Sequence, residues 1–335
     1  MVKFRQMSAF ILVCGLSTVM LQAQTRSYTM RTAGQHTDEV LGVFVNDDDT
    51  RFATCSLDET IKIWSLPDGR ELRTLRGHVG QVNNISFSGD DKLLASASAD
   101  RTVRVWDVET GTQKYVLRGH TAEVIGVYFS QDDSSRYIAS TSFDKTVKLW
   151  DTELQTEVKT LRGHSLPTNN IAYSYDGKYL ASCSDDRTIK IWSTDINRTD
   201  KEALMTLTGH NANVLTVLYS FDSKTLVSSD QDGVIKIWAM PSGQLMRTIN
   251  AHSELVQDIS FAEDNTTLVT ASLDKHVKLW NIKTGENITD FDAGVEIWSV
   301  DLVSDASEII LGCADGSVRM LIEKPGKGAG KKGGK

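Results

Sequence analysis

Six tryptophans recur at nearly constant intervals, and this internal repeat constrains the fold more than any other feature of the chain. Successive members are 42, 44, 42, 46 and 42 residues apart. Each ends an alternating run of apolar and polar residues such as Thr146–Trp150 (TVKLW), a pattern typical of a half-buried strand. A repeat of this length indicates an array of similar structural units rather than one or two ordinary domains.

Each unit carries further residues at fixed positions. An Asp stands six residues before each of these Trp residues, and a His opens each unit. The second unit is expected to contain four strands, at 81–87, 93–98, 102–107 and 113–117, separated by turns such as residues 109–111 (ETG). Because strand patterns fill the units and helical patterns are essentially absent, the sequence predicts an all-β fold.

Gly-His, a Ser-x-Asp turn and Trp-Asp pairs, as at Trp106-Asp107, resemble the WD40 repeat. The resemblance extends over roughly residues 26–323 and implies a β-propeller of four-stranded blades around a central channel. A seventh, divergent unit has Leu321 in the Trp position and Ala293 in the His position. It lacks a fourth strand of its own, so we expect residues 27–31 (SYTMR) to supply that strand. The prediction is a seven-bladed WD40 β-propeller whose last blade the N-terminal strand closes.

His, Ser and Asp together could indicate a hydrolytic triad, but a catalytic set is needed once and this one appears six times. In WD40 proteins these groups and the Trp hydrogen-bond within a blade, so the resemblance implies a structural network. The fifth unit departs from the pattern, since Asp230 replaces Ser and two carboxylates, Asp230 and Asp232, are expected near His210. The network is assigned to His36, Ser56, Asp58, Trp64, His78, Ser98, Asp100, Trp106, His120, Ser142, Asp144, Trp150, His164, Ser184, Asp186, Trp192, His210, Asp232, Trp238, His252, Ser272, Asp274 and Trp280.

The resemblance also implies a top face that takes peptides near the mouth of the channel. Trp298 is the only Trp outside the repeated position, and Glu39, Glu123 and Glu296 would surround it and its apolar companions. Such a cluster could be a binding hot spot, or several of its side chains could pack inside the loops. The partner-binding positions are Leu41, Leu57, Asn83, Ile125, Phe143, Asn169, Asp185, Leu215, Gln257, Leu273 and Trp298.

The two ends of the chain differ from the repeats. Residues 1–23 combine a basic start, an apolar run at 7–21 and Leu21-Gln22-Ala23, the three-part pattern of a secretory signal peptide. A buried segment, or a retained anchor, is the alternative, although the run is short for a bilayer span. The organisation expected is a signal peptide at 1–23, a propeller at 24–323 and a basic tail at 324–335. No transmembrane span is expected in the mature chain.

Composition restricts the function without identifying it. A net charge of -8 argues against nucleic acid as a partner. Neither a metal site nor a cofactor is expected, because the repeated His residues belong to separate blades. Cys55, Cys183 and Cys313 lie in apolar strand patterns and are expected to be buried free thiols.

The first hypothesis is a non-catalytic interaction scaffold that binds a protein or peptide, as a monomeric ring within a larger complex. It would be extracytoplasmic: periplasmic, envelope-associated or secreted. One alternative is a cytoplasmic adaptor, if the N-terminal run is not a signal. The other is an enzyme, which would need a non-repeated cluster of titratable residues at the channel mouth.

Overall fold

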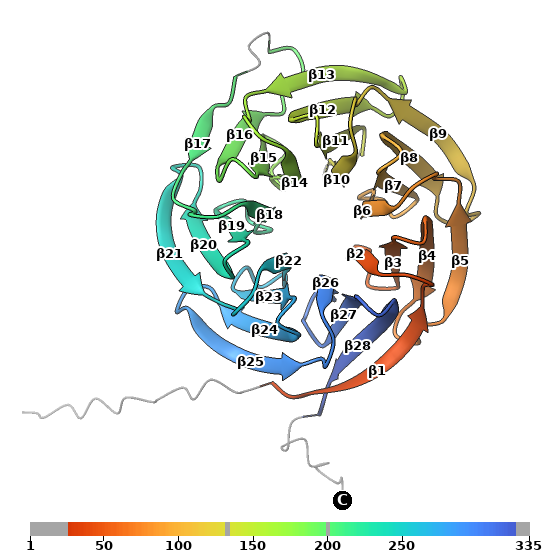
Figure 1. The fold of residues 1–335 in the computed structure, drawn as a ribbon, viewed down its shortest axis with the longest axis vertical. Coiled ribbons are helices and arrows are strands. Elements are labelled where there is room, and N and C mark those ends of the chain that lie inside the picture. Colours follow the sequence, from red (N-terminus) through yellow and green to blue (C-terminus); the bar gives the residue numbers. More distant parts are fainter. Residues whose placement is uncertain (1–25, 131–134, 199–201, 326–335) are drawn as a thin grey trace, which may run out of the picture.

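The chain forms a ring of seven blades, each a four-stranded antiparallel sheet (Figure 1). The computed structural model describes residues 26–130, 135–198 and 202–325. Within these ranges every regular element is a strand, and no helix occurs that could span a membrane. Both the all-β fold and the seven-bladed propeller predicted from the sequence are confirmed.

Six blades are built from four consecutive strands each. Blade 1 comprises β2 (Val40–Val45), β3 (Arg51–Ser56), β4 (Thr60–Ser65) and β5 (Glu71–Arg76). Blade 2 comprises β6 (Val82–Phe87), β7 (Leu93–Ser98), β8 (Thr102–Asp107) and β9 (Gln113–Arg118). Blade 3 comprises β10 (Val124–Phe129), β11 (Tyr137–Ser142), β12 (Thr146–Asp151) and β13 (Thr156–Arg162). Blade 4 comprises β14 (Thr168–Tyr173), β15 (Tyr179–Ser184), β16 (Ile189–Ser193) and β17 (Met205–Leu207). Blade 5 comprises β18 (Val214–Tyr219), β19 (Thr225–Asp230), β20 (Val234–Ala239) and β21 (Gln244–Asn250). Blade 6 comprises β22 (Val256–Phe261), β23 (Thr267–Ser272), β24 (His276–Asn281) and β25 (Glu286–Asp292).

Blade 7 combines the two ends of the propeller. It contains β26 (Ile297–Leu302), β27 (Glu308–Cys313), β28 (Ser317–Glu323) and β1 (Tyr28–Gln35). β1 pairs antiparallel with β28, from Tyr28 opposite Glu323 to Gln35 opposite Ser317. The predicted closure by the N-terminal strand is therefore confirmed, and β28 is paired on both sides.

Apolar side chains between neighbouring blades form the core. One such cluster joins Ala53, Ile61 and Ile63 of blade 1 to Phe87 and Trp106 of blade 2. Because alternate residues of a strand face opposite sides, each blade can bury apolar residues against both of its neighbours. The Trp that ends each alternating run is buried in such a cluster, as Trp106 is between blades 1 and 2.

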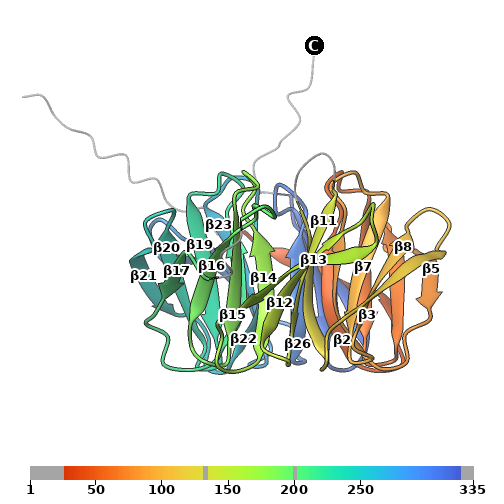
Figure 2. The same cartoon turned by 90° about the horizontal axis from the view of Figure 1, so that it is seen from above.

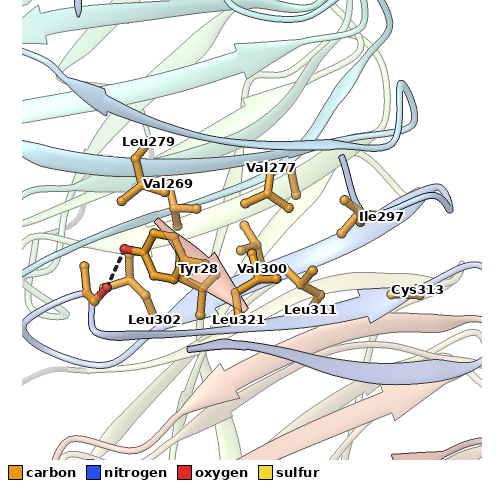
Figure 3. Packing of buried hydrophobic residues seen from close by; sticks show 14 of the residues in the cluster. Tyr28, Val269, Val277, Leu279, Ile297, Val300, Leu302, Leu311, Cys313 and Leu321 are labelled. Carbon is orange, nitrogen blue, oxygen red and sulfur yellow. Dashed lines mark hydrogen bonds between the residues drawn. The ribbon is translucent and has the colours of Figure 1, made fainter. Parts of the chain in front are cut away.

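Tyr28 anchors the closing strand. Figure 3 shows its ring among Val269 and Leu279 of blade 6 and Leu321 of blade 7. Its hydroxyl donates a buried 2.8 Å hydrogen bond to the carbonyl of Ala306. Closure of the ring thus combines main-chain pairing with insertion of one aromatic side chain into the core.

Blade 7 compensates for the residues it lacks. Leu321 is fully buried in the Trp position, and Arg319 connects the turn to the loop in which the His is missing. The Arg319 guanidinium donates to the Ala293 carbonyl at 2.6 Å and pairs with Asp315 at 2.6 Å. The three cysteines of the described chain are free and buried, as predicted.

Candidate functional site

A hydrogen-bonded relay connects His, Asp, Ser and Trp inside the repeated blades. In blade 3, His120 Nδ1 lies 2.8 Å from Asp144 Oδ2, and His120 Nε2 lies 2.8 Å from Ser140 Oγ. Trp150 Nε1 donates to the same hydroxyl at 2.8 Å. A neutral imidazole with its proton on Nδ1 satisfies every member, because the Ser hydroxyl can then donate to Nε2. The polar groups of the relay are therefore used within the blade.

The structure corrects which hydroxyl belongs to this relay. It comes from the residue two positions before the predicted Ser, so the members are Thr54, Ser96, Ser140, Ser182, Ser228 and Thr270. The predicted residues, Ser56, Ser98, Ser142, Ser184 and Ser272, support the turn instead. Ser142 Oγ, for example, accepts from Asp144 N at 3.0 Å and donates to the Ala122 carbonyl at 3.2 Å. Both residues face the same side of the strand, but only the deeper one reaches the indole.

Blade 5 also differs from the prediction. Asp230 Oδ2 lies 2.6 Å from His210 Nδ1, so Asp230 supplies the carboxylate that Asp232 was expected to supply. Asp230 also accepts backbone N–H groups of Asp232 and Val234 at 3.0 Å. The Asp232 side chain is exposed. One buried carboxylate at the end of β19 therefore serves both the His and the turn.

The relay holds its carboxylates in the ionised form. Burial opposes ionisation of Asp58, but hydrogen bonds from Thr60 and Thr37 and the proximity of His36 outweigh it and lower the pKa of Asp58 to about 2. Burial lowers the pKa of His36, which favours the neutral imidazole. A neutral His next to an ionised Asp fits a hydrogen-bonded support for the turn.

Replacing the relay hydroxyl should cost more stability than replacing the turn hydroxyl. In Ser140→Ala, Trp150 Nε1 loses its acceptor and His120 Nε2 loses its donor, so we expect a loss of about 2–4 kcal/mol in the free energy of unfolding. Ser142→Ala, the matched control, should cost about 1 kcal/mol because turn groups lie nearer to solvent. Urea unfolding followed by Trp fluorescence measures both, and equal losses would contradict the relay assignment.

We define the top face as the loops at residues 36–39 and 57–59, their equivalents in the other blades, and the first two residues of each inner strand. Four of the predicted partner-binding residues belong to these loops, and the other seven are the second residues of the inner strands. Figure 2 shows the ring edge-on, with its loops gathered on two opposite faces. Phe143 is 45% exposed. The remaining predicted positions are half-buried: Leu41, Leu57, Asn83, Ile125, Asn169, Asp185, Leu215, Gln257, Leu273 and Trp298.

Two of the predicted polar residues bridge blades. The Asn83 amide donates to Glu123 at 2.9 Å and to the Val124 carbonyl at 2.8 Å, which joins blade 2 to blade 3. Asn169 donates to Asp185 at 2.8 Å and to the Val214 carbonyl at 2.9 Å, which joins blade 4 to blade 5. These side chains organise the top face, because their amide N–H groups are already used.

Sequence reasoning missed two exposed residues that accompany Phe143. Val79 is 78% exposed and Leu166 is 45% exposed, both in top-face loops. Thr168, two residues after Leu166, bonds to the Ser142 carbonyl at 2.9 Å, next to Phe143. We call Val79, Phe143 and Leu166 the apolar patch. A signal for Val79 was present, because the residue after the His is Thr, Ser or Asn in the other five units.

Acidic residues accompany this face. Glu123 accepts from Gln81 at 2.9 Å and thereby connects the loops of Val79 and Phe143. At the neighbouring blades 1 and 7, burial and the nearby carboxylates of Asp38 and Glu296 raise the pKa of Glu39. The top face therefore combines apolar side chains with carboxylates that lack a full set of neutralising partners.

Comparison with known families gives one result that covers most of the chain. A family model for the WD domain, G-beta repeat (WD40), matches residues 27–65, 69–107, 111–151, 155–193, 201–239 and 243–281. The first match runs from β1 to β4, so each sequence repeat begins with the outer strand of the preceding blade. The divergent unit of blade 7 lies beyond these matches. Comparison with curated proteins found no match.

Proposed function

Since this chain belongs to the WD40 family, we propose that it is a non-catalytic scaffold that binds a protein or peptide on its top face. The apolar patch carries the proposal. Three large apolar side chains, on loops of blades 2, 3 and 4, remain in contact with solvent although the propeller has a complete core elsewhere. Exposed apolar clusters with polar surroundings are typical of protein interaction surfaces.

The surroundings of the patch indicate what kind of partner would fit. Phe143 is the aromatic member of the patch and is 45% exposed, and Glu123 lies beside it because its carbonyl accepts from Phe143 N at 3.0 Å. Glu39 and Glu296 add negative charge at blades 1 and 7. A partner with an apolar anchor and flanking Lys or Arg residues would match both features, because opposite charges steer association and an apolar anchor supplies affinity.

We further propose that the ring is exported and works outside the cytoplasm, as one monomeric ring within a larger complex. The signal-peptide prediction rests on residues 1–23, which lie outside the described residues. The first strand begins at Tyr28, so cleavage after Ala23 would leave every described strand intact. The alternative, a cytoplasmic adaptor, would retain the N-terminal residues.

Affinity capture with the full chain as bait tests both proposals in one experiment. We expect the variant Val79→Asp/Phe143→Asp to recover at least about tenfold less of a partner that the parent chain recovers. Leu154→Asp is the matched control, because Leu154 is 64% exposed in the β12–β13 turn on the opposite face. Mass spectrometry of the bait should identify Gln24 as its first residue.

The outcomes separate the two proposals. Equal recovery by the double variant and by Leu154→Asp would reject the top face as the binding surface. A bait that retains Met1 would reject cleavage after Ala23 and favour the cytoplasmic adaptor. Either result can occur without the other.

A further inference from the structure

A cavity of about 300 Å³ lies in the central channel, at the end opposite the top face. It is lined by residues of the inner strands of all seven blades and by several of the loops that follow them, such as residues 46–49. The cavity is separate from both the relay and the apolar patch, because no residue of either lines it. Its volume suits a small organic group.

The charged residues of the cavity wall are all acidic. They are Asp47, Asp49, Asp258, Glu263 and Asp301, and the described lining includes no Lys, Arg or His. The five acids lie in three blades, and although Asp47 and Glu263 occupy equivalent positions, no position is acidic in all seven blades, so the acids are not part of the repeated pattern. An acidic, partly enclosed cavity concentrates negative potential and favours a cation.

Aromatic rings form another part of the wall. Phe44 meets Tyr128 edge-to-face at a centroid distance of 5.7 Å, and Tyr175 lies 4.5 Å from Phe221. Aromatic faces attract organic cations and also provide apolar contact for an aliphatic stem. A small, strongly hydrated metal ion would gain little from such a wall. No group of three or more metal-ligating side chains close enough to hold a metal ion occurs among the described residues.

The two deepest carboxylates are held in place by hydrogen bonds across blades. Asp258 accepts from Ser299 Oγ at 2.6 Å, which links blades 6 and 7. Asp301 accepts from Ser260 Oγ at 2.6 Å and from Val45 N at 2.7 Å, which links blades 6, 7 and 1. These donors are neutral, so the negative charge in the channel is positioned without a cationic partner.

We propose that the cavity binds a primary alkylammonium group, such as that of a lysine side chain, between its carboxylates and its aromatic rings. The ammonium would lie near Asp258 and Asp301, and the aliphatic stem would contact the rings of Phe44, Tyr128, Tyr175 and Phe221. A bound ammonium group would neutralise part of the negative charge of the carboxylates that line the cavity.

Proton release should accompany binding. Burial raises the pKa of Asp258 to about 7, that of Asp301 to about 6 and, with Asp91 and Glu263 nearby, that of Asp47 to about 6. These carboxyls are partly protonated near neutral pH, and a bound cation favours their ionised forms. The other titratable groups around the cavity are Asp48, Asp49, Tyr128 and Tyr175. Affinity should therefore rise from pH 5.5 to pH 8.

The lysine could come from the chain itself or from another molecule. β28 ends at the same face of the ring as this cavity, because Glu323 N donates at 2.8 Å to the Ser307 carbonyl in the loop that contains the lining residue Ser304. Residues 324–335 carry five Lys and no acidic residue. Comparing the full chain with a chain that ends at Pro325 separates these two sources.

Isothermal titration calorimetry with Nα-acetyl-lysine methylamide tests the proposal, with the neutral Nα-acetyl-norleucine methylamide as the matched probe. We expect the lysine probe to bind, to bind more tightly at pH 8 than at pH 6, and to release protons. The norleucine probe should not bind. Asp258→Asn should weaken binding at least about tenfold, and so should Asp47→Asn/Glu263→Gln, which changes only groups at the mouth. Asp222→Asn removes an exposed carboxylate outside the cavity and should bind as the parent does.

Each outcome has a defined meaning. Weaker binding to the full chain than to the shortened chain identifies the chain's own lysines as competitors, and equal binding indicates a ligand from another molecule. Binding to neither chain, equal binding of the norleucine probe, or unchanged affinity in both acidic variants overturns the proposal. Tighter binding of Ca²⁺ than of the lysine probe would also overturn it. Thermal unfolding of each variant separates lost binding from lost folding.

Discussion

A chain without residues 26–35 is expected to lose the closed ring and most of its resistance to unfolding. This deletion removes β1, exposes the β28 edge and empties the buried position of Tyr28. Truncating one large core side chain costs about 3–5 kcal/mol, and the deletion also removes a whole strand ladder, so the loss should exceed that range. Urea unfolding followed by circular dichroism, with size-exclusion chromatography, measures the loss and any association through the open edge.

Two comparisons make this result specific to closure. A chain that begins at Gln24 keeps β1 and should unfold at the same urea concentration as the parent chain. A synthetic peptide of residues 26–35, added to the deleted chain, should restore stability by pairing with β28. An unchanged midpoint in the deleted chain would show that closure contributes little.

Trp150→Ala should give the second large effect, a loss of about 3–5 kcal/mol. The Trp150 side chain is 1% exposed and packs in the cluster between blades 2 and 3 with residues such as Val103 and Val105. Its loss leaves a cavity and removes the indole donor from Ser140. Urea unfolding measures the change.

Trp298→Ala is the matched comparison, because it removes the same side chain from a half-buried position at the top face. Its loss of stability should be clearly smaller, and under the proposed function it should weaken capture of a partner. Equal destabilisation by the two variants would assign Trp298 a role in the core rather than at the surface.

The fold could be predicted because its determinants are local and repeated. The alternation in Thr146–Trp150 identifies a strand without knowledge of its neighbours, and six such copies identify the ring. The missing fourth strand of the last unit and the residues 27–31 together predicted the closure that β1 makes. Here each local preference agrees with the global architecture, so local patterns were sufficient.

The relay hydroxyl could not be predicted from spacing alone. Ser140 and Ser142 are two residues apart and lie on the same face of β11. Either would satisfy the period of the strand, and only the depth to which the His and Trp rings reach selects Ser140. In blade 5, Asp230 stands at the turn position that Ser142 has in blade 3 and binds His210 in place of Asp232.

The sequence by itself therefore determined the strands, their grouping into blades and the way the ring closes, since these depend on periodicity and on short-range turns. The tertiary structure decided which side chains meet. Asp47, Asp258 and Asp301 are far apart along the chain and lie in no common motif, yet they line one cavity. The physical reason is circular closure, which brings the inner strands of all blades around one axis and thereby places unrelated positions next to each other.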